Sequence, residues 1–436
     1  MRAASSFPPL VLVLALCTCG APPPRSSTGP GASAEVVTSW NARILEIGES
    51  VDGFLTLKGV RTAAMAHLAM NDALAAIQPR YEPYTWRGRA ENADPVEAAS
   101  EAAYAVALAQ YPDFAAELTD ERARWTATVG AGPPDDVGTA AARAVLARRE
   151  GDDWNVDAAY QWHPMGPGVY AEFNEHSGTP EGFVFGAGWA IAVPFALDDP
   201  GQFRSPPPPA IDDPEYARAF NEVKAVGAAQ SEMRTEDQAH LAMWWKEFVE
   251  KSHNRLAREL TKKEELDLWD AARLFALLNA SIFDGYVASF DAKFHYNHWR
   301  PYTAIRWASN DGNPATEEDP TWTNLHDHTY AFPSYPSAHG TVCAAAMTVM
   351  EDAFGQAYPF DMTIREVDSR GPLSEKVTMD PAVRSFRSFY DAAMECSFSR
   401  VYLGIHFRYD SDAGTELGLN VGRQVLERLL PLSRGG

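Results

Sequence analysis

Apolar residues recur at steps of three and four over several long stretches of the chain, which is the spacing of one face of an α-helix. The clearest stretches cover residues 40–77, 95–111, 135–150 and 235–250. The same pattern predicts further helices at about 213–228, 262–290, 339–354, 381–403 and 411–430. No strand–helix alternation and no repeat of fixed period interrupts them, so we predict an all-α helical bundle.

Residues 151–215 break this pattern. They are rich in Pro and Gly, as in "WHPMGPGVYAEF", and have little periodicity. We predict an ordered, irregular segment that wraps over the helical body. It separates an N-terminal helical region, residues 38–150, from a C-terminal helical bundle, residues 216–432.

The start of the chain resembles a targeting sequence. Arg2 precedes the apolar run "FPPLVLVLALC", which is too short for a stable membrane span and predicts an export signal over residues 1–24. "LCTC" loosely resembles a bacterial lipoprotein cleavage site with Cys19 as the lipidated residue, and simple cleavage is the alternative. Residues 25–37 predict a flexible tether, and no later apolar run reaches membrane-spanning length. We therefore expect an exported protein, periplasmic or extracellular, which is either free or lipid-anchored through Cys19.

Composition limits the choice of partners. The 436 residues are 46% hydrophobic, which is ample for a large core, and the formal net charge is −22. Such an acidic surface argues against nucleic-acid binding. An anionic ligand would need a local cluster of Lys and Arg to overcome the overall repulsion.

Three short stretches in the last third of the chain gather cationic and nucleophilic side chains. They are "KFHYNHWRP" with Lys293 and Arg300, "PSAH" with Ser337, Ala338 and His339, and "SRVYLGIHFRYD" with Arg400, His406 and Asp410. The two guanidinium groups offer bidentate forks, and the lysine adds a point charge. The helix predicted after Ser337 would present backbone N–H groups and a favourable dipole to an anion.

Each stretch alone has a plainer explanation: a solvated surface, a helix N-cap, or an ion-paired helix face. Asp410 follows His406 by four residues, so on a helix the two would share a face and the carboxylate would fix the imidazole tautomer. All three stretches together, in this order, predict an oxyanion site.

These stretches resemble the signature shared by vanadium-dependent haloperoxidases, type-2 phosphatidic acid phosphatases and bacterial acid phosphatases. That signature reads Lys, six residues, Arg-Pro; then Pro-Ser-Gly-His; then Ser-Arg, five residues, His, three residues, Asp. Ala338 replaces the glycine; it keeps the backbone N–H, and it fits if its backbone is right-handed or extended. A loop over residues 361–380 would absorb the long gap before the third stretch. Residues 60–84, 189–203, 206–227 and 234–245 are similar to the bacterial haloperoxidase-like branch, so the resemblance covers nearly everything from about residue 38 to 430.

The resemblance implies a bundle of the haloperoxidase/acid phosphatase type, with vanadate as a phosphate-competitive cofactor and no haem or nucleotide. The implied vanadate-holding residues are Lys293, Arg300, Ser337, Ala338 through its backbone, Arg400, and His406 as the ligand of vanadium. His339 would act as acid–base and Lys293 would polarise bound peroxide, with hydrogen peroxide and halide as substrates. Phe332 matches the phenylalanine that chloroperoxidases tend to carry five residues before the motif serine.

The same residues also suit a phosphatase. In that alternative a phosphate ester is the substrate, His406 is the nucleophile that forms a phosphohistidine, and His339 protonates the leaving alcohol. A third possibility is an exported binding protein without turnover. The sequence leaves these alternatives open.

Three further features have two explanations each. Cys343 and Cys396 are either a disulfide or two buried thiols. His326 and His328 either hold a metal or line the entrance of the anion site. Asp284 is either a partner for one of the site arginines or an exposed helix acid.

Overall fold

The computed structural model describes residues 34–52, 57–127, 136–171 and 184–433. The predicted export signal and most of the predicted tether lie outside the described residues. The tether prediction is wrong for residues 35–37, because the first helix already begins at Glu35. Among the described residues, no helix is both long and apolar enough to cross a membrane.

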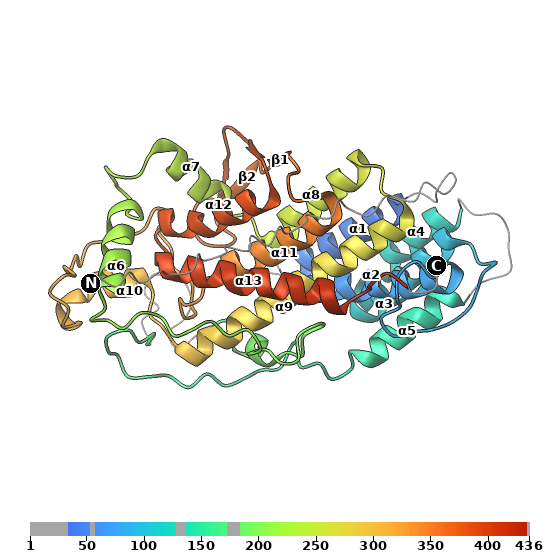
Figure 1. Ribbon diagram of the computed structural model, residues 1–436, viewed down its shortest axis with the longest axis horizontal. Helices are drawn as coiled ribbons and strands as arrows, with labels where there is room; N and C mark the ends of the chain where they lie inside the picture. The colour runs from blue at the N-terminus through green and yellow to red at the C-terminus, as the bar shows by residue number, and fades with distance from the viewer. Residues whose placement is uncertain (1–33, 53–56, 128–135, 172–183, 434–436) are drawn as a thin grey trace, which may run out of the picture.

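The architecture is helical, as predicted from the periodicity. The α-helices of the described residues are α1 (Glu35–Asp52), α2 (Leu57–Ile77), α3 (Pro95–Gln110), α4 (Ala115–Thr126), α5 (Val137–Arg148), α6 (Pro214–Val226), α7 (Glu236–Trp244), α8 (Val249–Lys263), α9 (Leu268–Tyr296), α10 (Pro301–Arg306), α11 (Ala338–Phe354), α12 (Phe389–Tyr402) and α13 (Arg408–Arg428). Short 3-10 turns are η1 (Pro112–Phe114), η2 (Ala187–Ile191) and η3 (Ala308–Asn310). In Figure 1, α1 to α5 occupy one end of an elongated molecule, and α6 and α10 occupy the other.

Helix α9 runs through the middle of the molecule beside α11 and α13 (Figure 1). It begins where Asp267 caps the backbone N–H of Asp270, and it ends where Asn297 adopts a left-handed conformation. Its Leu, Ala and Phe residues are buried nearly all round, which is the pattern of a central helix. The left-handed end turns the chain sharply just after Lys293 and just before Arg300.

Helices α11 and α13 approach each other closely through glycine. A Cβ on Gly414 would lie 2.5 Å from the Ser337 carbonyl oxygen, and one on Gly418 would lie 2.1 Å from that of Thr341. Only a residue without a Cβ fits at either position. This close approach holds the start of α11 against the start of α13.

The disulfide alternative holds for the remaining cysteines. Cys343 on α11 and Cys396 on α12 form a disulfide with their Cα atoms 6.6 Å apart. Both residues are buried. The bond therefore cross-links the helix that begins at Ser337 to the helix that carries Arg400.

Two antiparallel ribbons lie between α11 and α12, where the sequence predicts a loop and then a helix. Strand β1 (Phe360–Thr363) pairs with β4 (Val383–Phe386), and β2 (Glu366–Asp368) pairs with β3 (Lys376–Thr378). The helix predicted over 381–403 is wrong at its start. Residues 383–386 bond to β1, and α12 starts only after Ser388 caps it.

The described residues between α5 and α6 contain only η2 as a helical turn, as expected for the Pro- and Gly-rich segment. They follow one long side of the bundle in Figure 1. The segment is fastened to α9 by Asp284, which accepts hydrogen bonds from the backbone N–H groups of Phe195 (2.6 Å) and Ala196 (2.8 Å).

Candidate oxyanion site

The predicted site residues lie at helix ends that meet in space. Lys293 is in the last turn of α9, and Arg300 is the N-cap residue of α10. Ser337 caps α11, whose first two residues are Ala338 and His339. Arg400 is in the last turn of α12. His406 and Asp410 lie on either side of the N-cap residue of α13.

A cavity of about 610 Å³ opens at this meeting point. Five of the predicted residues line it: Arg300, Ala338, His339, Arg400 and His406. Lys293 and Ser337 do not line it. The remaining wall is largely aromatic, with one further cation, Lys246.

Arg300 is held by two backbone carbonyl groups. Its Nε donates to the Phe332 oxygen (2.8 Å), and its Nη1 donates to the Ile405 oxygen (3.0 Å). Its Nη2 is buried and has no hydrogen-bond partner among the described residues. Burial lowers the pKa of Arg300 to about 10, so the guanidinium stays charged at neutral pH. The Phe332 ring lies 4.7 Å from the guanidinium carbon and also lines the cavity.

Arg400 approaches the cavity from α12. Its Nη1 donates to the Trp245 carbonyl oxygen (3.2 Å), and its side chain also pairs with that of Tyr330. Its Nε is buried and unpartnered within the described part of the chain. Each arginine therefore keeps one nitrogen for an external acceptor, and both line the same cavity.

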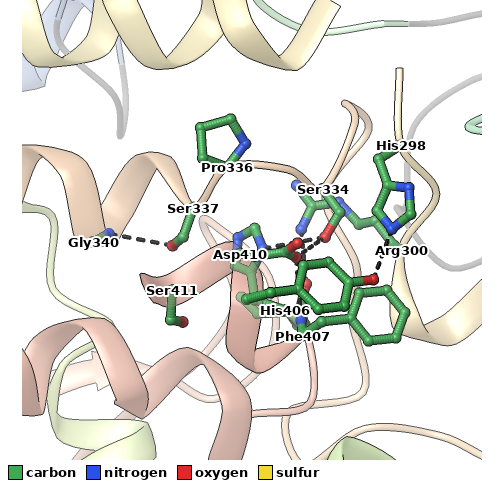
Figure 2. A network of polar contacts seen from close by, with 12 residues as sticks. His298, Arg300, Ser334, Pro336, Ser337, Gly340, His406, Phe407, Asp410 and Ser411 are labelled. Atoms are coloured by element: carbon green, nitrogen blue, oxygen red, sulfur yellow. Dashed lines mark hydrogen bonds and ion pairs between the residues drawn. The ribbon is translucent and has the colours of Figure 1, made fainter. Parts of the chain in front are cut away.

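His406 is oriented by Asp410 (Figure 2). The His406 Nδ1 lies 2.9 Å from Asp410 Oδ2, and the Ser334 hydroxyl and the Phe407 N–H also donate to that oxygen. Because Nδ1 faces the carboxylate, Nε2 is the nitrogen left with a lone pair for a ligand. Burial, and then Arg300, Lys293 and Arg400, lower the pKa of His406, which keeps the ring neutral.

The predicted pair of His406 and Asp410 is therefore present, but its geometry differs from the prediction. His406 precedes the helix, so the two residues do not share a helix face. Asp410 lies in the first turn of α13, and its carboxylate reaches back to the N–H of the N-cap residue Phe407 and to the residue before it. Burial raises the pKa of the Asp410 carboxyl.

The structure corrects the expectation that Lys293 contacts the anion directly. Its Nζ donates to the carbonyl oxygens of Pro333 (3.0 Å), Ser334 (2.7 Å) and Pro336 (2.6 Å). An ammonium group has three donors, and all three point at the loop before α11. Burial and then Arg300 lower the pKa of Lys293. As placed, Lys293 shapes the loop and contributes its charge from behind it.

Ser337 acts as a helix cap. Its Oγ accepts the N–H of Gly340 at 3.2 Å. The first helical N–H groups, those of Ala338 and His339, have no acceptor within the helix. Ala338 starts α11 in a right-handed conformation, which meets the condition for alanine at this position. The helix start, with its N–H groups and dipole, reaches the cavity at Ala338.

His339 lines the cavity from the second position of α11. Its Nε2 has no partner among the described residues, and its pKa is lowered by burial, then by Arg400 and His253. A neutral imidazole beside two guanidinium groups can accept a proton there. It is suited to proton transfer at a bound guest.

Two of the remaining alternatives are settled. His328 lines the cavity at the end nearest residues 371–374, whereas His326 is buried behind it. His328 is thus placed as the entrance explanation expects, and His326 is not. Both explanations of Asp284 are wrong: the residue is fully buried and so is not an exposed acid, and it does not partner Arg300 or Arg400. Its bonds go to the irregular segment, and the arginine near it is Arg149.

Comparisons with known proteins place this geometry in a family. A family model described as the VCPO second helical-bundle domain matches residues 273–435, which contain every predicted vanadate-holding residue. The chain is 27% identical to the vanadium chloroperoxidase of Curvularia inaequalis over 274 residues, 51% of this chain and 44% of that protein. It is 28% identical to the vanadium-dependent bromoperoxidase of Ascophyllum nodosum over 137 residues, 29% of this chain and 23% of that protein.

Solved structures agree in fold. The first bacterial vanadium-dependent iodoperoxidase matches with a TM-score of 0.73 at 21% identity, over 94% of this chain and 100% of that one. A holo-type bacterial vanadium-dependent chloroperoxidase matches with a TM-score of 0.65 at 17% identity, over 85% of this chain and 91% of that one. Residues 273–435 are thus similar to the VCPO second helical-bundle domain, and the fold is that of solved vanadium-dependent haloperoxidases.

These similarities leave the individual reaction open. The alignments span less than half the length of either curated relative. The relatives are named for three different halides, so the family alone does not assign a halide to this chain.

Sequence reasoning missed several residues that build the site. Ser334 donates to Asp410 and lies three residues before Ser337, so its position in the motif loop was an available signal. Tyr330 and Trp245, which hold Arg400, and Lys246 in the cavity wall gave no such signal. Trp245 and Lys246 are far from the motifs in sequence, and only the fold brings them to the site.

Proposed function

We propose that this protein binds vanadate and uses it to oxidise halide with hydrogen peroxide. One observation carries the proposal: the unpartnered Arg300 Nη2 and Arg400 Nε share a cavity with the start of α11 and with His406. Buried donors without partners are costly unless a guest satisfies them. A tetrahedral oxyanion is a guest that fits two guanidinium groups and a helix N-terminus.

Each residue of the site has a separate role in this proposal. Arg300, Arg400 and the Ala338 N–H would hold the oxygens of the oxyanion, and His406 Nε2 would bind vanadium. When bound, vanadate supplies a Lewis acid that activates peroxide toward a halide. Lys293 and Ser337 support the loop that shapes the pocket, and Asp410 fixes the His406 tautomer. His339 accepts a proton from incoming peroxide.

The decisive experiment is a paired assay on metal-free protein with and without orthovanadate. We expect vanadate to switch on halogenation of a phenolic dye in the presence of peroxide and at least one of chloride, bromide and iodide. Turnover of a phosphate monoester that vanadate inhibits, with no halide oxidation, would instead identify a phosphatase. A lack of response in both assays would support the binding protein.

Export is proposed from the N-terminal pattern alone. N-terminal sequencing of protein recovered from a bacterial host tests it, because the mature chain should begin near residue 25, after the predicted signal, or at Cys19. Metabolic labelling with a fatty acid separates lipidation at Cys19 from simple cleavage, and Cys19→Ser is the control.

A further inference from the structure

The cavity is larger than its proposed small reagents require. Its volume is about 610 Å³, whereas a halide ion and a hydrogen peroxide molecule each need on the order of 30–60 Å³, the space of one or two waters. Pockets of several hundred Å³ with apolar walls and a few polar groups are typical of sites for organic ligands. The volume of this cavity therefore indicates a ligand larger than halide or hydrogen peroxide.

One wall of the cavity is a continuous aromatic surface. The Phe332 ring lies 5.2 Å from that of Phe290, 5.6 Å from Tyr330 and 6.2 Å from Phe185. All four rings line the cavity, as does Tyr286. Stacking on such rings favours a planar aromatic guest.

The cavity lining also includes a cation that the oxyanion site does not use. Lys246 and Phe248 lie there with residues 371–374 at the tip of the β2–β3 hairpin. The Lys246 side chain is buried, with the residue 8% exposed, and its Nζ donates to the carbonyl oxygens of Asp368 and Arg370. Two of its three donors are thus used, and no carboxylate pairs with it within the described part of the chain.

A buried ammonium group without a carboxylate partner is costly, and an anionic ligand would remove that cost. The nearby carboxylate of Asp368 is already paired with Lys376 at 2.8 Å. Burial, and then Arg400, lower the pKa of Lys246 to about 7, in line with an ammonium group that has no carboxylate paired with it.

We propose that this cavity binds an aromatic acceptor that carries an acidic group, with the ring on the Phe332 wall and the acid on Lys246. The inference rests on the proposed function, which supplies hypohalous acid next to the bound ring. In the halogenation step a ring carbon forms a bond to the halogen as the O–halogen bond breaks. The electron pair of that bond leaves on hydroxide. The ring then loses H⁺, which combines with hydroxide to give water.

Direct binding to vanadate-free, full-length protein tests the acceptor site without any turnover. The probes are 1-hydroxy-2-naphthoate and 1-naphthol, which share the ring system and differ by the carboxylate. We expect saturable calorimetric binding of the naphthoate. Lys246→Met should weaken it at least tenfold and change 1-naphthol binding by less than twofold, whereas Lys246→Arg should retain the preference for the acid.

Arg365→Met is the matched control, because it removes an exposed cation next to the same hairpin that does not line this cavity and leaves the Lys376–Asp368 pair in place. It should leave naphthoate binding unchanged. Equal loss in both variants would mean that the hairpin fold, and not the Lys246 charge, carries the effect, and it would overturn the proposal. An absence of saturable naphthoate binding to wild-type protein would overturn it as well.

Product analysis adds a second readout. With vanadate, peroxide and bromide, the enzyme should brominate the naphthoate with an isomer ratio different from that of reagent hypobromous acid, and with preference over an equimolar small phenolic dye. Identical ratios and no preference would contradict the acceptor site while leaving the proposed function intact. Binding of the naphthoate without any halide oxidation would contradict the proposed function and leave the anionic aromatic site standing.

Discussion

At the residue scale, the central feature is a neutral imidazole whose lone pair is aimed by a buried carboxylate. Asp410 accepts hydrogen bonds from Ser334, Phe407 and His406, so one side chain ties the motif loop, the start of α13 and the proposed vanadium ligand together. Such a partner fixes both the tautomer and the orientation of a metal-binding histidine.

Asp410→Asn tests this role. Ser334, Phe407 and His406 all contact Oδ2, and Oδ1 has no partner among the described residues, so the amide keeps the shape but removes the negative charge that favours a proton on His406 Nδ1. We expect vanadate affinity to fall about 10–100-fold, measured by calorimetric titration of the metal-free protein. Asp412→Asn is the control, an exposed acid two residues further along the same helix, and it should bind vanadate like the wild type.

His339 is expected to matter for turnover and not for binding. It lines the cavity with an Nε2 that has no partner among the described residues, whereas in the proposed function the two arginines and His406 contact the oxyanion. His339→Ala should therefore lower kcat about 10²–10⁴-fold and leave the vanadate Kd within a few-fold. A parallel loss of vanadate affinity would instead make His339 part of the anion-holding set.

At the scale of elements, a single carboxyl fastens the irregular segment to the central helix. Asp284 is fully buried on α9 and accepts the N–H groups of Phe195 and Ala196. The helix rises about 1.5 Å per residue, so Lys293, nine positions further along, is roughly 13–14 Å away. Distance along the helix explains why Asp284 supports the segment and does not serve the site.

Burial raises the pKa of Asp284 to about 6. Between pH 4 and 6 the folded protein holds this proton and the unfolded chain does not, so stability from this group is lost as pH rises through that window. The loss is on the order of 3 kcal/mol. Urea unfolding at several pH values measures this. From pH 4 to 6 the free energy of unfolding of the wild type should fall relative to that of Asp284→Asn. A pH-independent difference between the two proteins would contradict the raised pKa.

Helix ends, more than helix faces, build this site. The left-handed end of α9, the cap of α11 and the first turn of α13 each place a functional residue beside a turn. The disulfide between Cys343 and Cys396 links α11 to α12, and the close approach at Gly414 holds the start of α13 against Ser337. A helix prediction from periodicity locates such ends only to within a few residues, which is why it ran through residues 383–386.

At the scale of the whole molecule, a chain of net charge −22 contains a pocket lined by Lys246, Arg300 and Arg400. A ligand that binds only the folded state raises the free energy of unfolding by about 2.7 kcal/mol at a hundred times its Kd. Orthovanadate and phosphate should therefore each raise the Tm of metal-free protein, and phosphate should compete with vanadate in titrations. Potassium chloride at matched ionic strength is the control, and an equal Tm shift with chloride would show only general screening.

The sequence by itself determined the helical class and the residue types of the anion site, because periodicity and a spaced set of Lys, Arg, Ser and His are local features. It also identified His406 and Asp410 as partners, although not by the geometry that joins them. The tertiary structure alone decided how each donor is used. Lys293 donates to loop carbonyl groups, and Arg300 and Arg400 each have one nitrogen without a partner among the described residues. Lys246, from a segment distant in sequence, lines the same cavity. These outcomes depend on burial and on contacts between residues far apart in the chain, which no local pattern records.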